Sequence, residues 1–110
     1  MEGLVVGDIV VIEFPFSSLK GSKRRPVLIL KVPKGKDIIV SQITGSSYEK
    51  SVEVKIEDKD FGQGSLKRKS FVRIDKIASI EKSLIKYKIG LLKSEKFNEI
   101  LNKILLFLKE

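Results

Sequence analysis

Short valine- and isoleucine-rich segments, separated by turns that contain glycine or proline, fill most of this chain. Apolar β-branched runs bounded by such turns are typical of β-strands. Pro26 is expected to begin the second strand and Gly90 to end the last, because these residues interrupt regular pairing. The predicted strands are residues 9–14, 26–32, 38–43, 51–56, 71–80 and 84–89. Strands this short and closely spaced favour a small, strongly bent sheet or barrel.

One amphipathic helix follows the strands. Residues 94–109 repeat apolar side chains at helical spacing, and Ser94 is placed to cap the first turn. Leu106 and Phe107 widen the apolar face, which either packs into the domain or forms part of an oligomer surface. The expected inner face comprises Phe97, Ile100, Leu101, Ile104, Leu105 and Leu108. We expect one mainly β domain over residues 1–110, with the helix packed against the barrel.

The two longer connections, residues 15–25 and 57–65, are predicted to be loops. Between them, residues 51–56 alternate in polarity as a half-exposed strand does. Glu53 and Lys55 are therefore expected to face solvent.

Charge and composition narrow the function. The chain of 110 residues has a formal net charge of +8, which favours RNA, DNA or an acidic protein segment as partner, although basic charge also serves solubility alone. It contains no cysteine and no histidine, so the commonest metal ligands and the commonest general base are missing. No segment has the length of a membrane span and the first residues do not resemble a signal peptide. We expect a cytoplasmic protein without metal, cofactor or membrane partner.

The basic segment from Lys20 to Pro26 is the first candidate site. Proline holds the preceding residue extended, so Arg25 is placed on stiff backbone, whereas Lys23 and Arg24 are expected in the loop. A fixed guanidinium at a sheet edge suits phosphate binding. The alternative is a solvated basic loop.

Two further clusters have a functional and a structural interpretation. Thr44 and Ser46 lie in a small polar turn that either cradles an oxyanion or satisfies its own backbone. Arg73 and Asp75, two residues apart on one strand, project from the same face. They form either an anion site in which a carboxylate orients the arginine, or a structural ion pair.

Aromatic and basic residues in predicted loops are candidates for RNA contacts. Phe16 and Phe61 are placed to stack on bases, whereas Phe14 is expected in the core. Residues 67–69, Lys-Arg-Lys, form either a solvated turn or part of an electrostatic track for nucleic acid.

Taken in order, these segments are similar to the sequence signature of the MazF/PemK family of toxins. The matching segments are Gly7-Asp8-Ile9-Val10, Phe14-Pro15-Phe16, residues 23–30, Ser41-Gln42-Ile43-Thr44, residues 70–76, Ile80 and Ile89-Gly90-Leu91. The resemblance implies an SH3-like β-barrel that forms a homodimer and acts as a sequence-specific, metal-independent endoribonuclease on single-stranded RNA. It also implies a type II toxin–antitoxin system, whose antitoxin carries an acidic C-terminal tail that blocks the RNA site.

The resemblance also implies roles for individual residues. Arg25 and Thr44 match the residues that serve cleavage, in which a 2′-hydroxyl attacks phosphorus and both side chains stabilise phosphoryl charge. Some members carry a histidine in the first loop, where this chain has Phe16 and Ser17. The supporting RNA-binding residues are expected to be Lys23, Arg24, Phe16, Ser17, Ser46, Arg73 and Asp75.

Two questions stay open at this point. Arginine is a poor general base at its usual pKa, so Asp75 or Glu13 is a candidate for assisting proton transfer. A non-catalytic barrel that binds nucleic acid or a protein, as in related toxins that poison gyrase, is the alternative function. The presence of both Arg25 and Thr44 argues against it.

Overall fold

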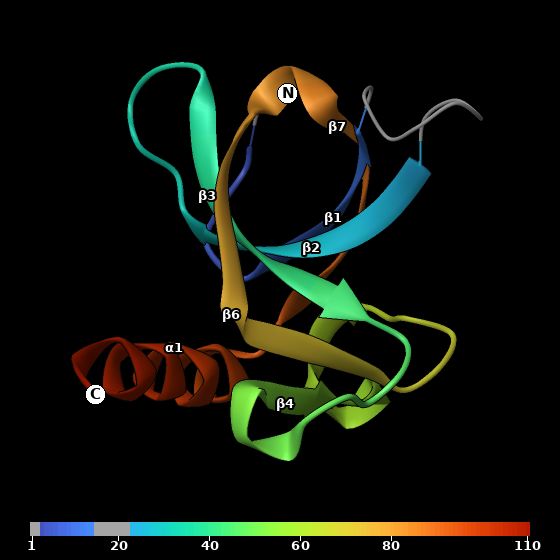
Figure 1. Ribbon diagram of the computed structural model, residues 1–110. Coiled ribbons are helices and arrows are strands. Elements are labelled where there is room, and N and C mark those ends of the chain that lie inside the picture. Colours follow the sequence, from blue (N-terminus) through green and yellow to red (C-terminus); the bar gives the residue numbers. More distant parts are fainter. Residues whose placement is uncertain (1–2, 15–22) are drawn as a thin grey trace.

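The structure, a computed structural model, describes residues 3–14 and 23–110. Strands and one helix follow one another along this part of the chain (Figure 1). None of its helices is both long and apolar enough to cross a bilayer. The elements are β1 (Asp8–Phe14), β2 (Lys23–Lys31), β3 (Asp37–Thr44), β4 (Glu53–Ile56), β5 (Phe61–Gly64), β6 (Ser70–Glu81), β7 (Ile85–Leu92) and α1 (Ser94–Lys109).

All the strands belong to one curled sheet, in the order β4-β6-β3-β2-β1-β7-β5. Neighbouring strands are antiparallel throughout. In Figure 1, β1, β2, β3, β6 and β7 curve around a ring, and α1 and β4 lie below it. The long β6 joins the two parts, because it pairs with β4 at its start and with β3 along its length. This arrangement confirms the expected mainly β barrel with a C-terminal helix.

Two clusters of buried apolar side chains support the curled sheet, and they use alternate residues of the same strands. Ile9 and Leu28 face the helix, whereas their neighbours Val10 and Val27 face the interior of the ring. Such alternation is the normal pattern of a strand with both faces covered. The interior cluster consists of Val10, Ile12, Val27, Ile29, Ile38, Val40, Ile80 and Ile85.

The helix spans the expected residues, but its N-cap and part of its inner face differ from expectation. Lys93, not Ser94, is the N-cap residue, and its side chain makes no capping hydrogen bond. The inner face is confirmed for Phe97, Ile100 and Ile104, which are buried. It is wrong for Leu105 and Leu108, which are exposed because only part of the apolar stripe meets the sheet.

The start of β2 also differs from expectation. Arg24 and Arg25 are part of the strand, paired with Glu13 and Ile12 of β1, so the predicted loop 15–25 is too long. Pro26 lies inside β2, just before the first pair with β3, Val27–Gln42. At this point β2 has a neighbouring strand on one side alone, which is where a strand tolerates proline. The remaining predicted loop, residues 15–22, lies outside the described residues.

Residues 57–65, predicted as a loop, contain a single helical turn (Asp58–Asp60) and β5. The short β5 carries two glycines and so gives little strand signal. Residues 50–52 likewise form a turn, so β4 begins at Glu53. Gly90 does not end β7 but lies inside it. Glycine is needed there because β5 passes so close that a Cβ would lie 2.4 Å from the Gln63 carbonyl oxygen.

Gly64 tests whether this close approach of β5 and β7 matters for stability. Its φ is +69°, and a Cβ there would lie 2.1 Å from the carbonyl oxygen of Ile89. Gly35 is the control, because its φ of +109° also lies in the range that favours glycine, but no atom lies within 4 Å of a Cβ built there. Gly35→Ala is expected to cost about 1 kcal/mol of unfolding free energy and Gly64→Ala about 3 kcal/mol or more. Urea unfolding measures both, and equal losses would contradict the packing argument.

Candidate functional site

The antiparallel register of β2 and β3 brings together the first two predicted site residues. Val27–Gln42 is the last pair of the two strands, and Arg25 and Thr44 each lie two residues beyond it, where β2 and β3 are no longer paired. Side chains two residues apart on a strand project from the same face, so Arg25 follows Val27 and Thr44 follows Gln42 on one face of the sheet. Accordingly, Arg25 and Thr44 both line the same two surface clefts.

Arg24 and Arg25 have different surroundings although they are adjacent. The guanidinium of Arg24 lies 3.3 Å from a carboxylate oxygen of Glu13, and its side chain is 60% exposed. Arg25 is exposed and makes no hydrogen bond or ion pair with the part of the chain that the structure describes. Its guanidinium is therefore available to an external anion. Lys23 begins β2; Phe16 and Ser17 lie outside the described residues.

Thr44 and Ser46 form the polar turn that the sequence indicates. The Thr44 hydroxyl accepts a hydrogen bond from the Ser46 amide at 3.3 Å and donates to the Ser46 carbonyl oxygen at 3.4 Å. Both contacts are long compared with ordinary hydrogen bonds. The turn thus satisfies its own backbone only weakly, and the hydroxyl stays at the edge of the clefts.

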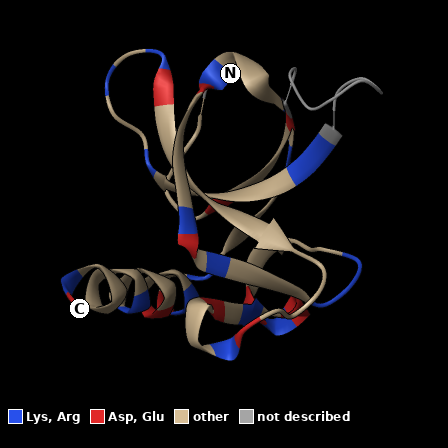
Figure 2. Ribbon diagram, in the orientation of Figure 1, with Lys and Arg blue, Asp and Glu red and all other residues tan. Residues whose placement is uncertain are grey.

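The clefts on either side of Arg25 and Thr44 are strongly basic. Their volumes are about 460 and 570 Å³. Among the described residues that line them there is no carboxylate. Figure 2 shows Lys and Arg at the start of β2, on β6 and on the loop after β5. The cationic lining residues are Arg24, Arg25, Lys67, Arg68, Arg73 and Lys76.

Arg73 and Asp75 lie where β6 bends away from β3. Ser41 pairs with Ile77 and Ile43 with Val72, so β6 carries extra residues that form a bulge. Within it, Arg73 donates two hydrogen bonds of 2.8 Å to the carboxylate of Asp75. The pair raises the pKa of Arg73 and lowers the pKa of Asp75, mainly through these bonds.

Buried Ser41 supports this bulge from the neighbouring strand. Its hydroxyl donates a 2.6 Å hydrogen bond to the carbonyl oxygen of Arg73, a residue in the segment of β6 that is not paired with β3. Ser41 belongs to one of the segments that resemble the family signature, but the sequence does not predict this contact. The ion pair expected from residue spacing is present, and Arg73 lines the larger cleft whereas Asp75 is not among its lining residues.

Glu53 and Tyr48 complete the site and were both missed by sequence reasoning. Glu53, expected to face solvent, is only 6% exposed. Its carboxylate accepts hydrogen bonds from the Ser47 hydroxyl and, at 3.1 Å, from the Tyr48 amide. These bonds lower the pKa of Glu53, the serine contact most of all. The polar segment before β4 could have indicated this contact, because its hydroxyl and amide groups can donate hydrogen bonds to a buried carboxylate nearby.

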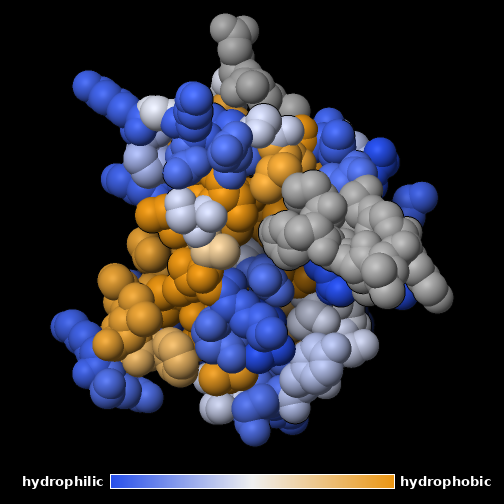
Figure 3. Space-filling view, turned by 45° about the horizontal axis from the view of Figure 1, so that its top comes forward, coloured by the Kyte–Doolittle hydropathy of each residue, from blue (hydrophilic) through white to orange (hydrophobic). Residues whose placement is uncertain are grey.

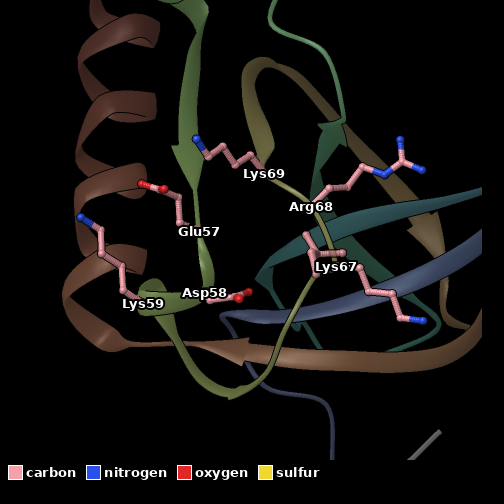
Figure 4. Close-up of a pocket in the computed structure, with 7 residues that line it drawn as sticks. Glu57, Asp58, Lys59, Lys67, Arg68 and Lys69 are labelled. Atoms are coloured by element: carbon pink, nitrogen blue, oxygen red, sulfur yellow. The ribbon is translucent and has the colours of Figure 1, made fainter.

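Among the remaining candidates, one is wrong and one lies in the cleft wall. Phe61, expected to stack on bases, belongs to the core and is 8% exposed. Residues 67–69 separate the smaller cleft from a further pocket of about 340 Å³. In Figure 4 the carboxylate of Asp58 points from the floor of that pocket toward this basic loop.

Comparison with known proteins places the chain among toxins. Residues 6–108 match the family described as PemK-like, MazF-like toxin of type II toxin-antitoxin system. A search of curated proteins found no match.

Solved structures agree with this family. The Mycobacterium tuberculosis toxin MazF-mt6 is 25% identical, with 88% of this chain and 91% of that chain covered and a TM-score of 0.69. An endoribonuclease in complex with its cognate antitoxin, from a Mycobacterial species, is 13% identical over 97% of this chain and 96% of that chain, with a TM-score of 0.73. Another Mycobacterial endoribonuclease is 15% identical over 99% and 94%, also with a TM-score of 0.73. At such identities the last two show the shared fold, and the family match extends over nearly the whole chain. The chain therefore belongs to the PemK/MazF-like family of toxins of type II toxin–antitoxin systems.

Proposed function

We propose that this toxin is a sequence-specific endoribonuclease that cleaves single-stranded RNA in the cytoplasm without a metal ion. The observation that carries the proposal is Arg25: an exposed guanidinium without a partner in the described chain, which lines two basic clefts together with Thr44. An unpaired cation beside a hydroxyl donor is suited to a phosphodiester that gains charge as it reacts.

The proposed reaction uses the RNA's own nucleophile. The ribose 2′-oxygen attacks the adjacent phosphorus and the bond from phosphorus to the 5′-oxygen breaks, which yields a 2′,3′-cyclic phosphate and a 5′-hydroxyl end. The 2′-hydroxyl loses a proton and the departing 5′-oxygen gains one. Arg25 and the Thr44 hydroxyl donate hydrogen bonds to the non-bridging oxygens, where negative charge accumulates.

The two carboxylates considered for proton transfer are engaged elsewhere. Both oxygens of Asp75 accept hydrogen bonds from Arg73, and Glu13 contacts Arg24 at 3.3 Å and Lys86 at 3.7 Å. A carboxylate with a lowered pKa, such as Asp75, is also a weaker base. We therefore assign Asp75 the role of holding Arg73 in the cleft, and assign neither carboxylate the role of general base.

The same surface accounts for the proposed partners. RNA binding by the cationic lining residues releases counterions and falls with added salt. An antitoxin with an acidic C-terminal tail presents negative charge as RNA does, and one similar structure is titled as an endoribonuclease in complex with its cognate antitoxin.

We further propose a homodimer, because α1 exposes Leu105, Leu106 and Leu108. A space-filling view shows hydrophobic residues gathered on the left, the side on which α1 lies (Figure 3).

Substitution of the two site residues tests the proposal. Arg25→Ala and Thr44→Val are each expected to slow cleavage of long single-stranded RNA in EDTA by about 100- to 1000-fold, because each removes one donor to the transition state. Arg24→Ala is the graded control, since its guanidinium already contacts Glu13, and a loss below about tenfold is expected. The amount of product followed over time gives the rate, and sequencing the 5′ ends of the products gives the specificity. Equal rates for wild type and Arg25→Ala would refute the assignment, and RNA binding without any cleavage would favour the non-catalytic barrel.

Acid unfolding tests the structural role given to the carboxylates. The folded protein lowers the pKa of Asp75 and of Glu53, so their stabilisation is present above the unfolded pKa and is lost as the pH falls below about 4. Asp75→Asn and Glu53→Gln are expected to melt below wild type at neutral pH, and the difference is expected to shrink in acid. Thermal melting across pH measures this. If Asp75→Asn instead removed the acidic limb of the pH–rate profile without changing stability, Asp75 would be the base.

A further inference from the structure

The exposed ring of Tyr48 lies at the edge of the larger basic cleft, with its backbone held in place. We propose that Tyr48 is a stacking platform for the RNA base next to the cleaved phosphate, and that this cleft is a nucleotide subsite. The proposal rests on the RNA-cleaving function proposed above and adds the residue that receives the base.

The backbone of Tyr48 is anchored although its side chain is 71% exposed. The anchor is Glu53 on β4, whose carboxylate accepts the Tyr48 amide at 3.1 Å and the hydroxyl of the preceding Ser47. Glu53 is itself buried, so the loop between β3 and β4 is tied to the sheet at this residue. An aromatic ring presented on an anchored loop loses little freedom when a ligand binds.

Arg73 fixes one side of the ring. Its guanidinium carbon lies 5.4 Å from the ring centroid, within the range of a cation–π contact. Arg73 in turn is held by the two hydrogen bonds to Asp75 and, at its carbonyl oxygen, by Ser41. No other ring or cation contact to Tyr48 occurs among residues 3–14 and 23–110. The ring thus has one face against a fixed cation and is otherwise open to solvent.

The cleft joins this ring to the proposed cleavage residues. Tyr48 and Arg73 line the same 570 Å³ space as Arg25 and Thr44, a volume within the range of small-ligand sites. A phosphate at Arg25 and a base on Tyr48 would occupy opposite parts of it. Lys76, at the same cleft, adds a cation for the neighbouring phosphate.

Gln42 gives the cleft a means of telling bases apart. It lies on β3 two residues before Thr44, on the same face, and lines the cleft while half-buried. Its side-chain amide has both a donor and an acceptor, and it makes no hydrogen bond with the described part of the chain. Stacking tolerates every base, whereas an amide next to the stacked ring can hydrogen-bond to the edge of some bases and not others.

Two tyrosine substitutions and one control test the platform by binding, independently of cleavage. The probe is a short single-stranded RNA that blocks reaction through a 2′-O-methyl group at the cleaved nucleotide. Tyr48→Ala is expected to weaken binding about tenfold, whereas Tyr48→Phe, which keeps the ring, stays within about twofold. Tyr87 on β7, 49% exposed and outside the cleft, is the matched control, and Tyr87→Ala is expected to bind as wild type does.

A base-removal cycle and a fluorescence measurement distinguish stacking from a structural effect. Removing the base at the stacked position is expected to weaken wild type about tenfold and Tyr48→Ala no further. The chain has no tryptophan and two tyrosines, so in Tyr87→Phe the emission comes from Tyr48 alone and RNA should quench it. Additive losses in the cycle, or unchanged emission on binding, would overturn the platform.

The outcomes separate this inference from the proposed function. If wild type binds the probe and shows the coupling but never cuts unmodified RNA, the cleavage proposal fails and the platform stands. If wild type cuts RNA and Tyr48→Ala binds as tightly as Tyr48→Phe, the platform alone is refuted.

Discussion

The antiparallel register between β2 and β3 determines where the side chains of the cleft point. Pairing of Val27 with Gln42 places Arg25 and Thr44 on one face, each two residues beyond the last pair, and turns Gln42 toward the same face. A shift of one residue would send each of these side chains to the other face of the sheet. The apolar clusters oppose such a shift, because Val27 and Leu28 are buried on opposite faces and would exchange environments. The core thus sets the geometry of a site that contains few core residues.

The bulge in β6 places Arg73 at the cleft, which the register of β2 and β3 alone does not do. A regular β6 would continue to pair with β3 through Arg73 and the residues that follow it. Extra residues between the paired segments let the strand bend, and the Ser41 hydroxyl donates a hydrogen bond to the carbonyl oxygen of Arg73 within the bend. Bulges often redirect side chains near functional sites. Here the bulge brings a guanidinium with its own carboxylate to the cleft while the rest of β6 stays paired.

The fold was predictable from the sequence where strands carried strong alternation or apolar runs. Residues 9–14, 38–43 and 71–80 each correspond to a strand of the structure. Prediction failed where the sequence pattern was weak. Two of the four residues of β5 are glycine, and Pro26 led to a predicted strand start three residues after the start of β2 at Lys23. The helix was placed correctly, but sequence periodicity does not say how much of an apolar stripe meets the sheet.

The candidate site was predictable in part, for a related reason. The Arg73–Asp75 contact follows from the spacing of two residues on one strand, and the closeness of Arg25 and Thr44 follows from a hairpin. Glu53 and Tyr48 were missed because their contact joins a strand to an irregular loop, and no periodicity describes a loop. The prediction that Phe61 stacks on bases was wrong because the segment predicted to be a loop contains β5, which begins at Phe61.

The anchor beneath Tyr48 has a consequence for how such a protein can diversify. Glu53 holds the loop through a backbone amide, a group that every residue except proline offers. Apart from the contact of its ring with Arg73, the side chain at position 48 is not needed to hold the loop. Tyr48 can be replaced by chance mutation while the barrel, Arg25 and Thr44 stay as they are. A surface of this kind allows target preference to drift across generations at almost no cost in stability.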